Sequence, residues 1–229
     1  MANKPQPIEL PLIPQYASIV LLLHGSQPPE LNKDVVAAAA GRPPSNHFTD
    51  PTTGSGWIWK NERLIVLSRI QGPDRTRLEV KQELPLEIDF GRVQSVMVEL
   101  LHAAAGRPTH SVGINYGMAV LDYTGAGTAA VNGLIDRGAT KAWLGATASA
   151  APELKLAFPF NRLKLRGERS VQLRVGQMAG VTSSVVVDLN YSIVAPTGPE
   201  ALKAVSKERI DQVTADIKRL ARRISRTPA

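Results

Sequence analysis

Histidines are the residues of this sequence most able to ligate a metal, because the chain has four of them and no cysteine. They are His24, His47, His102 and His110. No two have the i, i+4 spacing that places both imidazoles on one helix face, and no thiolate can complete a site. Only the turn at residues 106–108 would bring His102 near His110. We therefore expect no metal site and no cofactor.

Carboxyl groups suggest no catalytic centre either. Acid–base catalysis requires two acids that face each other, and Asp188, on the polar side of a predicted strand, has no convincing partner. Asp122 and Asp136 fit a solvated or helix-capping role equally well. The sequence has neither a Gly-x-x-x-x-Gly-Lys pattern nor a strand-linked Gly-x-Gly-x-x-Gly pattern for phosphates. We name no catalytic residue, and the sequence leans against an enzyme.

His24 carries the remaining enzymatic hypothesis. It ends the apolar run at residues 17–23 and precedes Gly25-Ser26, which resembles the strand-to-loop segment before the oxyanion hole of α/β-hydrolases; the Gly-x-Ser-x-Gly nucleophile elbow of that family is absent. Extended through residue 30, the segment resembles the opening of the small cobalt and iron chelatases, which alternate strands and helices throughout. Residues 57–84 and 160–194 instead predict antiparallel strands. A histidine that simply ends a buried strand is the simpler interpretation.

Positive charge is concentrated near the end of the chain. The net charge is +7, and residues 197–229 contain eight Lys or Arg against four Asp or Glu. A predicted terminal helix carries the apolar stripe Ile210, Val213, Ile217, Leu220 and Ile224, and its last turns carry Lys218, Arg219, Arg222, Arg223 and Arg226. Such a helix favours an anionic partner, although a solvated charged face explains it too. Our first hypothesis is a non-enzymatic protein that binds a macromolecular partner, or itself, through this basic C-terminal helix.

Nucleic-acid binding is the alternative hypothesis. Predicted strands carry the cations Arg77, Lys81, Lys164, Arg166 and Arg174. Aligned on one sheet face, these side chains would follow a phosphate backbone. Glu79, Glu83 and Glu168 interrupt the series, and aromatic residues, at 5%, offer few stacking platforms.

The elements that position these residues begin with strands at 17–24, 56–60, 63–71 and 75–84. A helix at 89–105 follows, with Asp89 as its N-cap. Strands at 110–123, 140–148, 160–166, 170–177 and 184–194 then lead to the final helix, which starts with a capping box at Thr197 and Glu200. Shorter helices are expected at 30–40 and 129–137, and a loop at 42–55. On the strand at 110–123, one face is bare and favours a packed helix, with a ligand as the alternative; it consists of Gly113, Asn115, Gly117 and Ala119.

These elements predict an α+β protein. Residues 17–106 and 107–229 have a similar element order, so we expect two related halves, each a mainly antiparallel sheet closed by a helix, behind an extended segment at 1–16. The duplication predicts two sheets side by side with helices on one face. The two ranges also fit one continuous domain.

Composition favours a cytoplasmic location. The absence of cysteine excludes disulfides. No apolar run approaches the roughly 18–20 residues of a membrane span, and the N-terminus lacks the apolar core of a secretory signal. We therefore expect no membrane association.

Four segments together resemble a bacterial family of uncharacterised, sporadically distributed proteins. They are an apolar strand with a Pro-containing turn at 19–29, a Trp-led hairpin before a helix at 57–101, the core Gly113-Ile-Asn-Tyr116, and Val187-Asp188-Leu189 before a terminal helix. Asn115 stands where the family would have an arginine. The resemblance implies an α+β fold and no particular activity, because none is established for the family.

Overall fold

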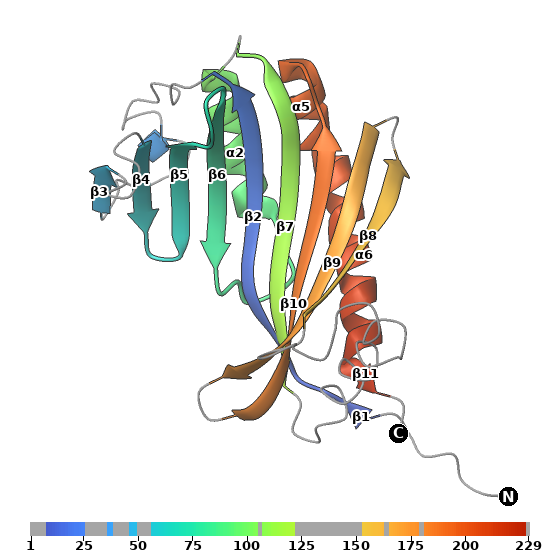
Figure 1. Ribbon diagram of the computed structural model, residues 1–229. Helices are drawn as coiled ribbons and strands as arrows, with labels where there is room; N and C mark the ends of the chain where they lie inside the picture. The colour runs from blue at the N-terminus through green and yellow to red at the C-terminus, as the bar shows by residue number, and fades with distance from the viewer. Residues whose placement is uncertain are drawn as a thin grey trace, which may run out of the picture.

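The computed structural model describes residues 8–25, 36–38, 46–49, 56–104, 107–121, 153–162, 165–178 and 181–227. Within these residues, nine strands form one sheet whose neighbours all run antiparallel, and helices pack against it (Figure 1). The predicted mixed α+β class with an antiparallel sheet is confirmed.

The main strands are β2 (Leu12–His24), β3 (Asn46–Thr49), β4 (Gly56–Asn61), β5 (Leu64–Ile70), β6 (Arg75–Glu83), β7 (Thr109–Leu121), β8 (Glu153–Arg162), β9 (Leu165–Met178) and β10 (Val181–Val194). The helices are α2 (Gly91–Ala103), α5 (Gly198–Ala204) and α6 (Lys207–Ser225), and residues 36–38 are also helical. A separate two-stranded sheet joins β1 (Ile8–Glu9) to β11 (Arg226–Thr227), which holds the two ends of the described chain together.

The strand order is β3-β4-β5-β6-β2-β7-β10-β9-β8, so β2 and β7 form the centre. Their register places Ile19 opposite Ile114. The expectation of two separate sheets is therefore wrong. An unpaired edge would leave the backbone N–H and C=O groups of a long strand without partners, so pairing β2 with β7 is more stable than leaving two edges. This pairing joins the two predicted sheets into one.

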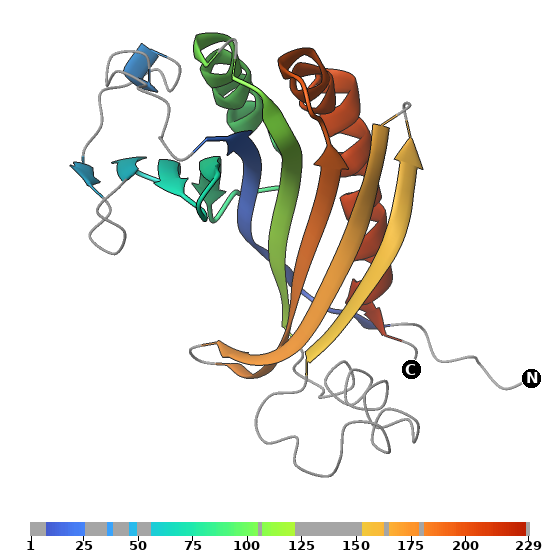
Figure 2. The same ribbon diagram turned by 45° about the horizontal axis from the view of Figure 1, so that its top comes forward.

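Helices α2, α5 and α6 lie on the same face of the sheet (Figures 1 and 2). Strand side chains alternate between faces, and the row facing the helices is apolar and buried, as Ile19, Ile114 and Tyr191 show. The buried cluster includes residues from both predicted halves. The opposite row of the central strands carries no described helix.

The N-cap of helix α2 lies one residue after the expected Asp89. Phe90 occupies the N-cap position, and the Asp89 carboxylate accepts a hydrogen bond from the Gly91 N–H at 3.0 Å. Phe90 is fully buried and its ring centroid lies 6.0 Å from that of Tyr116. Burial of this ring outweighs side-chain capping in setting the start of the helix.

The predicted final helix is divided in two. The capping box at the start of α5 is present as expected, with Thr197 and Glu200 bonded reciprocally. Helix α5 ends at Ala204, and the Ser206 hydroxyl accepts a hydrogen bond from the Arg209 N–H at 3.4 Å, which starts α6. Serine competes with the helical backbone for such bonds and favours a new cap.

Two other boundaries differ from expectation. The predicted strand at 160–166 spans the end of β8 and the start of β9, which are separate strands that pair antiparallel. The predicted loop at 42–55 contains β3, which pairs with β4. The predicted elements at 129–137 and 140–148, and most of the helix at 30–40, lie outside the described residues. Among the described helices, none combines the length and apolar character needed to cross a membrane.

Candidate functional site

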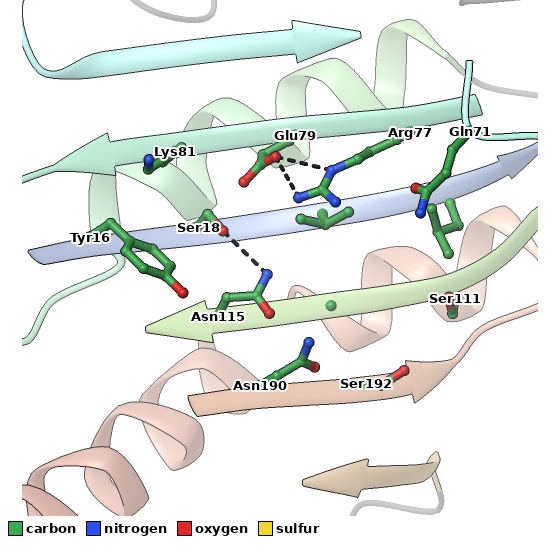
Figure 3. A pocket seen from close by; sticks show the side chains of 13 residues that line it. Tyr16, Ser18, Gln71, Arg77, Glu79, Lys81, Ser111, Asn115, Asn190 and Ser192 are labelled. Atoms are coloured by element: carbon green, nitrogen blue, oxygen red, sulfur yellow. Dashed lines mark hydrogen bonds and ion pairs between the residues drawn. The ribbon is translucent and has the colours of Figure 1, made fainter. Parts of the chain in front are cut away.

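The face of the sheet without described helices holds a polar hollow of about 370 Å³, here called the sheet groove (Figure 3). Strands β2, β6, β7 and β10 supply most of its lining. The lining residues are Tyr16, Ser18, Val20, Leu22, Gln71, Arg77, Glu79, Lys81, Ser111, Gly113, Asn115, Asn190 and Ser192. In Figure 3 the helices lie behind these strands.

Tyr16 stands at one end of the sheet groove. A register shift between Pro14 and Tyr16 places this residue opposite Gly117, and a Cβ atom at Gly117 would overlap the Tyr16 ring. The Tyr16 hydroxyl donates a hydrogen bond to Asp188 Oδ1 at 2.9 Å, and Lys81 Nζ lies 5.2 Å from the ring centroid. Gly117 thus provides the space in which the ring lies across the central strands.

A second hollow of about 330 Å³ adjoins the sheet groove. The two share Tyr16, Asn115 and Asn190, and the second extends over Lys155, Ser170, Gln172, Asp188 and Leu189. Together they form one elongated polar depression across the sheet. The expected helix over Gly113, Asn115 and Gly117 is not present among the described helices, because the opposite and more apolar row of β7 faces them.

The expected nucleic-acid residues are only partly brought together. Arg77 and Lys81 both line the sheet groove. Arg77 forms an ion pair with Glu79 at 2.6 Å, and Lys81 forms one with Glu83 at 3.5 Å. Arg166 is exposed on β9 and Arg174 lies further along the same strand, whereas Lys164 falls outside the described residues.

A second candidate surface, here called the basic groove, lies at the end of α6. It has a volume of about 510 Å³. Its lining consists of Leu10, Pro11, Leu12, Ile88, Lys218, Ala221, Arg222 and Ser225. Lys218 and Arg222 are exposed and one helical turn apart, and Leu10 and Ala221 are buried beneath them. The surface therefore combines an apolar floor with cations at its rim.

Of the other predicted partner-binding cations, Arg219 is not among the described lining residues of this groove. Arg219 is exposed and lies close enough to Asp216 to contribute to the lowering of its pKa. Arg223 lies within α6, and Arg226 lies in β11 opposite Glu9. The predicted cations thus divide among different surroundings, and Lys218 and Arg222 are the ones that the described lining of the basic groove includes.

Asp216 fixes α6 to the sheet. Its Oδ2 accepts hydrogen bonds from Arg169 Nη1 and from the Tyr191 hydroxyl, each at 2.7 Å. Burial alone would raise the pKa of Asp216, but the hydrogen bonds from Tyr191 and Arg169 outweigh it and hold that pKa below its ordinary value. Burial is the main cause of the raised pKa of Tyr191, and the hydrogen bond to Asp216 raises it further. This contact lies on the helix face and is structural.

Two of the four histidines lie close together, in a pair that the sequence did not predict. His24 lies near His110, with ring centroids 5.5 Å apart and an edge-to-face geometry, whereas His102 lies on α2. No cluster of three or more His, Cys, Asp or Glu side chains suited to a metal occurs among the described residues. The pair therefore gives no independent support to chemistry at His24.

The sequence did not predict Tyr16 or Asn190 as site residues, and it indicated Asn115 only as part of the bare face of β7. They come from three strands that are far apart in the chain and adjacent in the sheet. The one available signal was the bare face of β7, for which a ligand was the alternative interpretation. Comparison with known proteins gives no further guidance, since no protein-family model matches the chain and no curated protein is significantly similar to it.

Proposed function

We propose that this is a non-enzymatic binding protein that holds an acidic amphipathic segment of a partner protein in the basic groove. The observation that carries the proposal is an apolar floor bordered by the exposed cations Lys218 and Arg222. Apolar side chains of the partner would bury against Leu10, Leu12 and Ile88, and its carboxylates would meet the two cations. An amphipathic helix laid into a groove is a common recognition mode.

An exposed apolar side chain near the groove supports the same function. Leu86, two residues before Ile88, is 93% exposed. Single exposed leucines are ordinary, but one this close in the chain to Ile88 adds to the apolar surface that a partner in the basic groove can bury. The stripe of α6 does not add to this surface, because Ile210, Val213 and Ile217 are buried against the sheet.

Charge favours a different protein over a second copy of this chain. A symmetric contact would bring the same patch of both copies together, so Lys218 and Arg222 of one copy would face those of the other. Like charges across an interface are unfavourable. An acidic partner has the complementary charge, and the absence of cysteine supports placing this interaction in the cytoplasm.

The test is the double charge reversal Lys218→Glu with Arg222→Glu. Its probe is a fluorescent helical peptide with leucine at i, i+3, i+4 and i+7 and glutamate between them, and its readout is anisotropy. The variant loses two charge pairs with the glutamates of the peptide and gains two repulsive contacts, which should weaken binding by about tenfold or more. The matched control reverses Arg92 and Lys203, which are exposed on α2 and α5, and should bind like the wild type.

Two results would refute the proposal: no binding of the peptide by the wild-type protein, or the same loss in both variants. Circular dichroism of each variant checks that the fold is intact. Deletion of residues 197–229 would be a poorer test, because it would remove buried residues such as Ala201, Ala204 and Ile217 from the core and unfold the protein for unrelated reasons.

Nucleic-acid binding is the second candidate, because Arg77 and Lys81 lie together in the sheet groove. It ranks lower since Glu79 and Glu83 pair with these cations. It predicts binding to a short RNA or DNA that falls steeply as salt rises. Mass measurement on a sizing column before and after nuclease treatment tests whether the purified protein carries nucleic acid.

We also propose that the chain contains two related halves around an approximate two-fold axis between β2 and β7. The strand order supports this: the first strand of each predicted half lies at the centre and pairs with the last strand of that half, β2 with β6 and β7 with β10. In both halves the remaining strands continue outward. Separate expression of residues 107–229 tests whether this half folds once its β7 edge is exposed.

A further inference from the structure

We infer that the sheet groove is a binding site for a neutral oligosaccharide. This site is distinct from the basic groove, with which it shares no lining residue. The inference rests on the shape of the depression, on its floor, on the type of its polar groups and on the balance of its charges.

The shape fits an extended small molecule. The hollows of about 370 and 330 Å³ each lie in the range of roughly 300–1,000 Å³ typical of small-molecule sites. Because they share Tyr16, Asn115 and Asn190, one ligand can occupy both. A chain of linked rings matches this length better than a single ring does.

Part of the floor is apolar. This part is lined by Val20 and Leu22 of β2, beside Gly113 of β7. Gly113 is the partner of Val20 in the sheet and has no side chain to rise above it. Sugar rings present C–H groups on their faces, and these gain by contact with such a surface and with the ring of Tyr16.

The polar groups around the floor are mostly neutral. Amides and hydroxyls both donate and accept hydrogen bonds, as the hydroxyls of a sugar do. Asn115 Nδ2 donates to Ser18 Oγ at 3.2 Å. Within the described part of the chain, the side chains of Gln71, Asn190 and Ser192 have no protein hydrogen-bond partner, so their bonding capacity is available to a ligand.

The charged side chains that line the sheet groove, Arg77, Glu79 and Lys81, each contact an opposite charge within the protein, whereas Lys155 in the second hollow is exposed and has no ion pair among the described residues. Glu79 accepts from both Nε and Nη2 of Arg77, at 3.0 and 2.6 Å. Asp188 accepts from Tyr16 at 2.9 Å, and Lys81 lies between the Tyr16 ring and Glu83. An anionic ligand would have to compete with these carboxylates, whereas a neutral ligand leaves the pairs intact.

The experiment is saturation-transfer NMR with titration on the full chain. The probes are glucose, maltotriose, cellotriose, mannotriose and tri-N-acetylchitotriose, with AMP as an anionic comparison. We expect at least one trisaccharide to bind, more tightly than glucose and without dependence on salt. Asn115→Ala and Asn190→Ala should each weaken that binding by about two- to tenfold, the range for one lost hydrogen bond.

The control is Lys203→Gln, an exposed change on α5 at a distance from the groove, which should bind like the wild type. No binding by any saccharide overturns the inference, as does AMP binding that exceeds saccharide binding and falls with salt. Equal loss in the control also overturns it. The charge reversal of Lys218 and Arg222 should leave saccharide binding unchanged, so this inference and the proposed function fail independently.

Discussion

Replacing Gly117 by alanine tests the packing of Tyr16 across the central strands. A Cβ atom at this position would come closer than 3.0 Å to two Tyr16 ring atoms, a separation that real Cβ atoms do not show. The ring must therefore move. Because the Tyr16 hydroxyl is bonded to Asp188 at 2.9 Å, a displaced ring loses or distorts that hydrogen bond.

The expected cost combines two effects. Overpacking at a filled position costs about 1–3 kcal/mol. A hydrogen bond to a charged group contributes about 1.5–3 kcal/mol, and the lower figure applies because Tyr16 is half-buried and water can replace it. The sum predicts that Gly117→Ala lowers the free energy of unfolding by about 2.5–4.5 kcal/mol.

The decisive comparison is the same substitution in a Tyr16→Ala background. With the ring removed, the new methyl group has no ring atom to overlap. Glycine inside a strand is less favourable than alanine by about 0.5–1 kcal/mol, so Gly117→Ala should then be neutral or slightly stabilising. Urea denaturation of the four proteins at neutral pH measures this coupling.

Gly113→Ala is the matched control on the same strand. Its Cβ would lie 3.6 Å from the Cβ of Val20, an ordinary contact distance, so its cost should stay within about 1 kcal/mol. If Gly117→Ala costs the same in both backgrounds, or no more than Gly113→Ala, the ring does not occupy the space that the reasoning requires.

Three further outcomes are expected. Asp216→Ala should lower the free energy of unfolding by about 2–4 kcal/mol, because the buried Tyr191 hydroxyl and the partly buried Arg169 lose their bonds to the carboxylate. Asp211→Ala breaks an exposed ion pair on the same helix and should lower it by less than about 1 kcal/mol in the same urea assay. The difference in unfolding free energy between wild type and Asp216→Ala should be largest at neutral pH. It should shrink as pH falls below 3.8, the ordinary pKa of an aspartate, since the pKa of Asp216 is lowered in the folded protein and protonation removes its stabilisation. A difference that does not depend on pH would contradict this assignment. Thr197→Ala should lower the melting temperature at a cost of about 1 kcal/mol through loss of the capping box, and an unchanged melting temperature would show that the start of α5 is held by packing alone.

Local patterns predicted the individual elements well. The strand expected at 75–84 is β6, Arg75–Glu83, and the expected capping box of Thr197 and Glu200 starts α5. Each of these patterns is decided by neighbours in the chain. The start of α2 was misplaced by one residue, because the burial of Phe90 is a tertiary effect that a capping rule does not contain.

The sheet groove could not be predicted, because its residues meet only through strand pairing between distant segments. Tyr16 bonds Asp188, and Asn115 lies between Ser18 and Asn190 in the register. Nothing local in the sequence determines that β2 and β7 are neighbours. The bare side of β7 was visible in advance, but deciding between a helix and a ligand required knowing which face the helices take.

The central position of β2 has a consequence for synthesis. Its apolar residues 19–23 are translated before β6 and β7, its two neighbours in the sheet. The nascent chain therefore exposes an aggregation-prone segment for a long interval. We expect yield in expression to depend on chaperone supply and on slow translation more than the equilibrium stability of the finished protein would suggest.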